Sequence, residues 1–131
     1  MLTDYFSGKS ILLTGATGFL GKVILEKILR TFPNINCIYL SIKCNGRNAE
    51  DQAYDRYKKE IKDSVIFDSL KVELGTKSFR MLLKKKVRIL PMDLSKENLG
   101  LTDKNREELV NCLNVIINSA GTVEFDARLD L

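Results

Sequence analysis

Residues 10–21 read Ser-Ile-Leu-Leu-Thr-Gly-Ala-Thr-Gly-Phe-Leu-Gly, an apolar run that leads directly into three evenly spaced glycines. The apolar run predicts a buried strand, and the residues after it predict an amphipathic helix. The apolar residues of that helix recur at helical spacing: Phe19, Leu20, Val23, Ile24, Ile28 and Leu29. A strand, a glycine turn and a helix in this order are typical of the element that holds the pyrophosphate of a dinucleotide.

Each of the three positions in this turn favours glycine for a different physical reason. Gly15 allows a sharp turn at the strand end, Gly18 lets backbone N–H groups close on a pyrophosphate, and Gly21 lets the helix pack tightly against the strand. The helix N-terminus adds unpaired N–H donors and a positive dipole end. A nucleotide-triphosphate loop is not expected, because Ala16 stands where its first glycine belongs and Val23 where Ser or Thr would hold magnesium.

Composition indicates one globular unit and excludes several classes of protein. The chain has 131 residues, of which 44% are apolar, and no apolar run approaches the roughly 20 residues of a membrane helix. The N-terminus lacks the basic and apolar segments of a signal peptide. Cys37, Cys44 and Cys112 show no Cys-x-x-Cys spacing, which predicts buried or half-buried free thiols in a reducing, intracellular compartment.

Charge and residue usage exclude further chemistry. The chain has no histidine, which excludes a His-based metal site and a Ser-His relay, and we predict no metal. The net charge of +4 is mild. The densest basic run, Lys84–Lys86 with Arg88, predicts a solvated helix end; it has no interleaved aromatic residues, so a nucleic-acid partner is not expected.

The chain predicts an α/β fold in which strands and helices alternate. We expect strands at residues 10–14, 37–43, 87–92 and 114–118. We expect helices at residues 18–32, over most of 48–86, and at 103–113 after Thr102 as N-cap, with a turn at Asn45-Gly46. The core-facing residues of the long helical stretch should be Ile61, Val65, Phe67 and Leu70, with a second patch at Phe79, Leu82 and Leu83.

This order predicts a Rossmann-type doubly wound parallel sheet. Four strands form only the N-terminal half of such a sheet, and the fourth strand would normally pair with a fifth. An apolar parallel strand left as an open edge is an aggregation hazard. We therefore expect residues 1–131 to be a partial NAD(P)-binding Rossmann domain of a larger protein.

The residues after the second strand favour NADPH over NADH. Proteins that bind the non-phosphorylated cofactor place Asp or Glu there, whereas this chain has Lys43 and Arg47 and no acid before Glu50. Two cations attract a 2′-phosphate, which a carboxylate would repel. After the third strand, Asp93 is suited to accept a hydrogen bond from the adenine amino group. After the fourth strand, the small residues 120–121 leave room for the riboses.

Residues 14–21 resemble the cofactor motif of the extended short-chain dehydrogenase/reductases. More narrowly, the flanking segments resemble alcohol-forming fatty acyl-CoA reductases over nearly the whole chain. The segments that carry this narrower resemblance are residues 5–10, 22–27, 38–43, 93–95, 98–101 and 120–125. The resemblance implies NADPH-dependent reduction of a long-chain acyl-CoA to a primary alcohol, in two hydride steps through an aldehyde. Members commonly associate with peroxisomal or endoplasmic reticulum membranes.

The resemblance also implies roles for individual residues. Lys43 would meet the 2′-phosphate, where the family usually has Arg, so the charge is kept but the bidentate fork is lost. Gly121 stands where the family commonly has Ala. The implied contacts are Thr14, Gly15, Thr17, Gly18, Phe19, Leu20 and Gly21 for the pyrophosphate, Asp93 and Leu94 for the adenine, and Ala120, Gly121 and Thr122 for the inner cofactor face.

These reductases use a Tyr-x-x-x-Lys pair on a helix after the region present here, in which the tyrosine acts as general acid. Tyr54 and Lys58 match that spacing, but they follow the second strand in a charged helix, and we assign them no catalytic role. We therefore predict no catalytic residue in this chain and no activity for it in isolation. Two alternatives are another thioester or sugar-nucleotide member of the superfamily and a non-enzymatic NADPH-binding module.

Overall fold

The computed structural model describes residues 1–44 and 46–121. The strands are β1 (Ser10–Thr14), β2 (Cys37–Ile42), β3 (Val87–Pro91) and β4 (Val115–Asn118). The helices are α1 (Leu2–Phe6), α2 (Phe19–Thr31), α3 (Ala49–Arg56), α4 (Asp68–Leu74), α5 (Thr76–Lys86) and α6 (Asp103–Cys112). Among the described residues, no helix combines the length and apolarity needed to cross a membrane.

The four strands form one parallel sheet in the order β3-β2-β1-β4. β1 lies inside the sheet, with Ile11 opposite Ile38 of β2 on one side and Val115 of β4 on the other. The first two crossovers (β1 to β2 and β2 to β3) run outward in one direction, and the third returns the chain to the other side of β1. The strand order therefore reverses between β1 and β4. In open α/β sheets, ligands bind outside the carboxyl ends of the strands at such a reversal.

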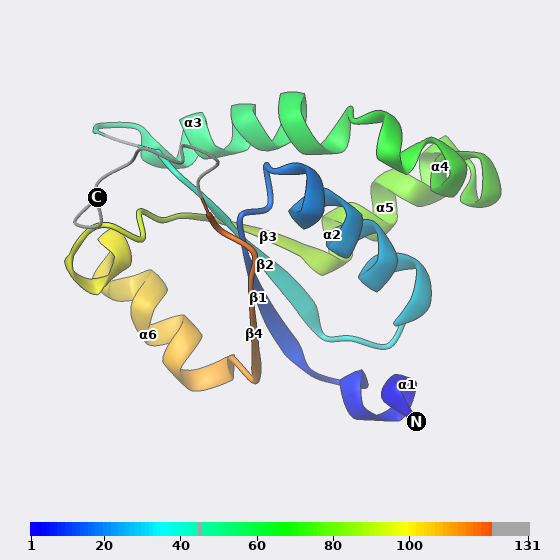
Figure 1. The fold of residues 1–131 in the computed structure, drawn as a ribbon, viewed down its shortest axis with the longest axis horizontal. Helices are drawn as coiled ribbons and strands as arrows, with labels where there is room; N and C mark the ends of the chain where they lie inside the picture. The colour runs from blue at the N-terminus through cyan, green and yellow to red at the C-terminus, as the bar shows by residue number, and fades with distance from the viewer. Residues whose placement is uncertain (45, 122–131) are drawn as a thin grey trace.

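Helices cover both faces of the sheet, as Figure 1 shows, with α2 to α5 on one face and α6 on the other. The larger core lies under α2 to α5 and includes the fully buried residues Ile11, Leu13, Leu25, Ile38, Leu40, Phe67 and Phe79. The smaller core, under α6, comprises Leu12, Cys37, Tyr39, Leu90, Met92 and Leu109. Successive residues of β1 and β2 are buried on both faces, which is usual for parallel strands.

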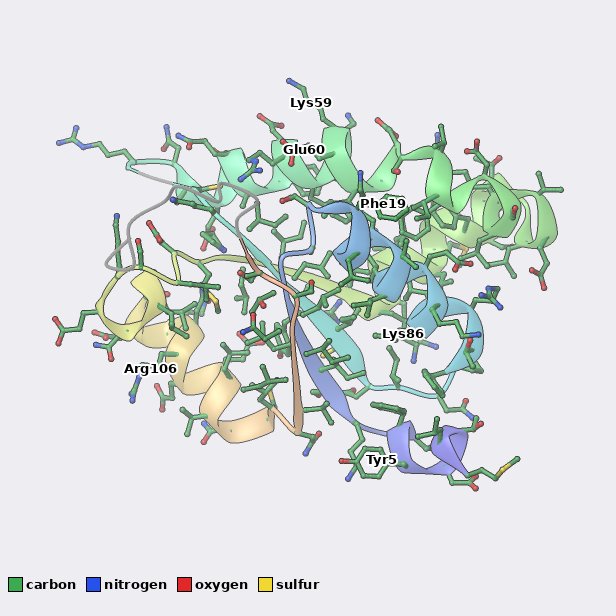
Figure 2. The ribbon with its side chains drawn as sticks, in the orientation of Figure 1. Tyr5, Phe19, Lys59, Glu60, Lys86 and Arg106 are labelled. Atoms are coloured by element: carbon green, nitrogen blue, oxygen red, sulfur yellow. The ribbon has the colours of Figure 1, made fainter. Side chains whose placement is uncertain are left out.

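Short segments between these elements close the ends of the core. The ring of Phe6 in α1 packs against Phe32, with 4.6 Å between the ring centroids. Lys86 (labelled in Figure 2) is half-buried, and its Nζ atom donates to the carbonyl oxygen of Ile35 at 2.5 Å. The expectation of a purely solvated helix end is therefore wrong for Lys86.

The parallel α/β fold is confirmed, and the strands lie within a residue or so of their predicted bounds. Thr102 caps α6 as expected, accepting from the N–H of Asn105 at 3.2 Å. The three cysteines are free, and each is buried or half-buried. Asn45 of the predicted turn lies outside the described residues, whereas α1 and a π-helical turn at Tyr57–Lys62 were not predicted.

Within the long helical stretch one core assignment is wrong. Ile61, Phe67, Leu70, Phe79 and Leu83 are buried and Leu82 is half-buried, but Val65 is 80% exposed. A 3-10 turn at Val65–Phe67, capped by the Ser64 hydroxyl, interrupts the helical periodicity. This turn directs Phe67 inward and leaves Val65 in solvent.

Phe67 and Val65 provide a matched pair for testing this core. The Phe67→Ala variant should lose about 3–5 kcal/mol of unfolding free energy, because it removes a fully buried ring that contacts Phe79. The Val65→Ala variant should stay within about 0.5 kcal/mol of the parent chain. Urea unfolding followed by circular dichroism measures both, and equal losses would contradict the placement of Val65.

Candidate cofactor-binding site

The glycine turn after β1 has no room for side chains at two of its positions. Gly15 has a φ of +69°, and a Cβ atom there would lie 2.5 Å from the carbonyl oxygen of Ser119. A Cβ atom on Gly21 would lie 2.9 Å from the Cα atom of Ala16. The first turn of α2 thus packs on the backbone of the glycine turn, which in turn packs on the chain leaving β4.

Gly18 has the different role of opening the N-terminus of α2. It is the N-cap with an ordinary φ of −75°, and a Cβ atom there would meet only the carbonyl oxygen of Gly15, at 3.4 Å. No side chain caps the helix, and its first turn contains no acidic residue. The first backbone N–H groups of α2 and its positive dipole end are therefore available to an anion.

A hydrogen-bonded junction joins the ends of β1 and β4 beneath this turn. Thr14 donates from Oγ1 to Oδ1 of Asn118 at 2.5 Å, and Ser119 donates from Oγ to the Thr14 carbonyl oxygen at 2.6 Å. The N–H of Ala120 donates to Thr14 Oγ1 at 3.4 Å. This junction holds residues 119–121 beside the glycine turn.

A cavity of about 660 Å³ opens at the carboxyl ends of the strands. Eight residues predicted from the sequence line it: Gly15, Thr17, Gly18, Lys43, Asp93, Leu94, Ala120 and Gly121. Four more were missed by sequence reasoning: Ser41, Arg56, Met92 and Ser119. Met92 and Ser119 adjoin predicted residues at strand ends, and Ser41 lies two residues before Lys43; this proximity is the signal that could have found them.

Five other predicted residues that the structure describes do not line the cavity. Thr14 is buried in the junction, and Gly21 is buried against the glycine turn. Phe19 and Leu20 stand on the first turn of α2 and are 78% and 60% exposed; Phe19 is labelled in Figure 2. Arg47 is exposed in the loop before α3. Thr122 lies outside the described residues, and a role for any of these residues in cofactor binding stays a prediction.

Asp93 is the acidic residue of the cavity wall, and it is held in a tight turn. It is buried, and its Oδ1 accepts from both the hydroxyl (2.6 Å) and the N–H (3.0 Å) of Ser95. These two hydrogen bonds lower the pKa of the carboxyl group, and the nearby charge of Lys43 adds to the effect. Asp93 is thus an ionised acceptor at neutral pH, fixed at the end of β3.

Arg56 brings a second cation to the side of the cavity occupied by Lys43. It donates from Nη1 to the carbonyl oxygen of Lys43 at 2.7 Å. Its Nε and Nη2 atoms donate to the two carboxylate oxygens of Glu60 at 3.2 and 3.0 Å. The guanidinium is therefore held between Lys43, directly after β2, and Glu60 of the π-helical turn.

Tyr54 and Lys58, which have the spacing of a catalytic Tyr-x-x-x-Lys pair, do not line this cavity. Tyr54 is about half exposed on α3, and Lys58 lies in the π-helical turn. Among the described residues no cluster of three or more His, Cys, Asp or Glu side chains could hold a metal ion.

The family model described as male sterility protein, an NAD-binding family, matches residues 13–131. The chain belongs to this family. It is 37% identical over 129 residues to the probable fatty acyl-CoA reductase 5 of Arabidopsis thaliana, with 98% of the chain and 25% of that protein covered. It is 38% identical over 128 residues to fatty acyl-CoA reductase 1 of Mus musculus, with 98% of the chain and 23% of that protein covered.

Solved structures agree with the family assignment. A reductase domain of a non-ribosomal peptide synthetase from Mycobacterium tuberculosis superposes with a TM-score of 0.65 at 28% identity, over 88% of this chain and 25% of that one. The terminal reductase domain of the myxalamid pathway superposes with a TM-score of 0.67 at 24% identity, over 91% of this chain and 26% of that one. This similarity supports the fold. The chain thus spans about a quarter of the length of the proteins it matches. Its membership of the male sterility protein family, an NAD-binding family, identifies it as a nicotinamide-dinucleotide-binding domain.

Replacing Gly15 or Gly18 by alanine should lower the unfolding free energy by different amounts. Gly15→Ala should lower the unfolding free energy by roughly 1–3 kcal/mol, because it forces a left-handed φ on alanine and a clash with the Ser119 backbone. Gly18→Ala should cost less than about 1 kcal/mol, because its conformation is ordinary and its surroundings are open. Urea unfolding of both variants checks this, and equal costs would refute the close packing at Gly15.

Asp93 should make stability depend on pH in the acid range. Its folded pKa lies below its unfolded pKa of about 3.9, so its stabilising contribution is present above that value and is lost as the pH falls through the folded pKa. Asp93→Asn should therefore be less stable than the parent near pH 7, and the difference should vanish in strong acid. Urea unfolding from pH 7 to pH 2 measures this, with Asp55→Asn as control. A constant difference across that range would contradict the assignment.

Proposed function

We propose that this chain is the NADPH-binding part of a fatty acyl-CoA reductase that converts a long-chain acyl-CoA to an alcohol through an aldehyde. One observation carries the proposal: the open N-terminus of α2 and the cations Lys43 and Arg56 line one cavity. The identity of 37–38% with fatty acyl-CoA reductases over nearly the whole chain supports the substrate class.

The chemistry of the cavity wall fits a dinucleotide. Gly18 leaves the first N–H groups of α2 open, and those groups suit a pyrophosphate. Ala120 and Gly121 carry little or no side chain, which leaves space for the riboses beside β4. Asp93 is fixed by Ser95 and ionised, so it is suited to accept a hydrogen bond from the adenine amino group.

The cofactor preference rests on the two cations. Lys43 follows β2, and Arg56 donates to its carbonyl oxygen, so both positive charges lie at the same strand end. The Nε and Nη2 atoms of Arg56 are paired with Glu60, so Arg56 offers a 2′-phosphate its remaining Nη hydrogens, which partly offsets the exchange of Arg for Lys at the end of β2. A 2′-phosphate gains two charge-assisted contacts there, whereas the bare hydroxyl of NADH gains little.

When bound, NADPH supplies the hydride for both reduction steps. The residues of this chain bind and orient it: the glycine turn holds the pyrophosphate, and residues 120–121 set the depth of the inner half beside β4. Within the part of the chain that the structure describes, no tyrosine lines the cavity. We therefore assign cofactor binding to these residues and no proton transfer.

Calorimetric titration with NADPH and NADH tests the cofactor assignment. The parent chain should bind NADPH more tightly than NADH, and Lys43→Gln and Arg56→Gln should each weaken NADPH binding by about tenfold or more, with little effect on NADH. Lys59→Gln is the matched control, because Lys59 is exposed and does not line the cavity. Equal affinity of the parent for both cofactors, or a Lys59→Gln effect as large as that of Arg56→Gln, would overturn the assignment.

Gly18→Trp tests the location of binding. The indole would cover the N-terminus of α2, and the open surroundings of Gly18 allow the variant to fold. We expect it to lose cofactor binding with its unfolding midpoint nearly unchanged.

Reductase activity is tested with the complete gene product supplied with NADPH and a long-chain acyl-CoA. Gas chromatography should detect the fatty alcohol from the parent protein and none from the Gly18→Trp variant. NADPH binding without aldehyde or alcohol would instead support the non-enzymatic cofactor module.

A further inference from the structure

A second cavity, of about 170 Å³, lies between the π-helical turn, α4 and α5. It has no residue in common with the cofactor cavity, and α4 lies at the far end of the helical layer from the start of α3 (Figure 1). Its polar lining consists of Lys58, Lys62, Asp63, Lys71, Thr76 and Arg80.

Four of these side chains are cations, and a single carboxylate faces them. Among the described residues, none of the four forms an ion pair, whereas Arg30 and Arg56 on neighbouring helices pair with glutamates. Like charges around one concavity repel one another, and a recess lined by one sign of charge concentrates ions of the opposite sign. Asp63 offsets only part of this positive charge.

The local backbone arranges these cations around the recess. The π-helical turn buries Tyr57 and Ile61 and places Lys58 and Lys62 in the cavity wall, whereas Lys59 between them points away from the molecule (Figure 2). Lys71 is half-buried, with its ammonium 5.4 Å from the ring centroid of Phe79, which positions it by a cation–π contact. π-Helical turns occur frequently at functional sites.

The start of α5 adds neutral donors to the same recess. α5 has 11 residues, its N-cap is Gly75, no side chain caps it, and its first turn has no acidic residue. Thr76, the first residue of α5, lines the cavity. Unpaired backbone N–H groups at a helix N-terminus supplement the cations as anion donors.

We propose that this second cavity binds a phosphate group. Its volume is well below the roughly 300–1,000 Å³ of a pocket that encloses a whole small molecule, so one phosphate would sit inside and the rest of its carrier outside. Lysine ammonium groups, an arginine fork and helix N–H donors together are suited to a doubly charged phosphomonoester. The carrier is either a soluble phosphorylated compound or the headgroup of a phosphomonoester lipid such as phosphatidic acid.

Titration of the 131-residue chain with inorganic phosphate and pyrophosphate, followed by calorimetry, tests the site. The Gly18→Trp background removes phosphate binding at the cofactor cavity. In that background, Arg80→Gln and Lys62→Gln should each weaken binding by about tenfold, and Asp63→Asn should tighten it. Lys59→Gln is the matched control, because it removes the same charge from the same turn without touching the recess.

Vesicle flotation separates the two carriers. Vesicles of phosphatidylcholine with phosphatidic acid are compared with vesicles of equal charge containing phosphatidylserine. Binding selective for phosphatidic acid and lost in Arg80→Gln identifies a lipid headgroup, whereas binding of free phosphates alone identifies a soluble carrier. The proposal is overturned if neither free phosphates nor phosphatidic acid vesicles bind, or if Lys59→Gln weakens binding as much as Arg80→Gln with both variants folded.

Discussion

The close backbone packing at the end of β1 is the constraint on which the rest of the site depends. Gly15 turns the chain with a left-handed φ directly against the backbone of Ser119, and Gly21 brings α2 down onto that turn. No side chain fits at either point. The result is a helix whose open N-terminus faces a cavity that the end of β4 borders on its other side. The proposed anion binding there follows from this steric exclusion, because the same absence of side chains exposes the backbone donors.

Of the two cations that line the cofactor cavity, Arg56 has a position fixed by hydrogen bonds. Arg56 is held by Glu60 on one side and by the carbonyl oxygen of Lys43 on the other, so its fork is oriented before any ligand arrives. Asp93 carries the opposite charge at the neighbouring strand end, tied to Ser95. Preorganised groups of this kind lose little entropy on binding, which supports the proposed preference for NADPH.

The alternation of strands and helices could be predicted from the sequence because its signals are local. Apolar runs with the period of a buried strand, Thr102 as an N-cap and Pro33 after a helix each act within a few residues. The helices between Asn48 and Lys86 are harder to predict, because the charged, amphipathic pattern of this segment suits one long helix as well as several short ones. The π-helical turn and the Ser64-capped 3-10 turn interrupt the helical periodicity there, and Phe67 is buried while Val65 stays exposed.

The candidate site likewise combines residues that local sequence signals predict with residues that only tertiary packing brings to the cavity. The sequence by itself determined the glycine turn, the cation Lys43 at the end of β2 and the acid Asp93 after β3, because the carboxyl ends of parallel strands converge whatever else the chain does. Only the tertiary structure decided that Arg56 reaches the cavity, that Arg47, Phe19 and Leu20 do not line it, and that four cations surround a second recess. Those outcomes depend on where helices fold back across the sheet, and distances between residues far apart in sequence are set by core packing rather than by local propensity.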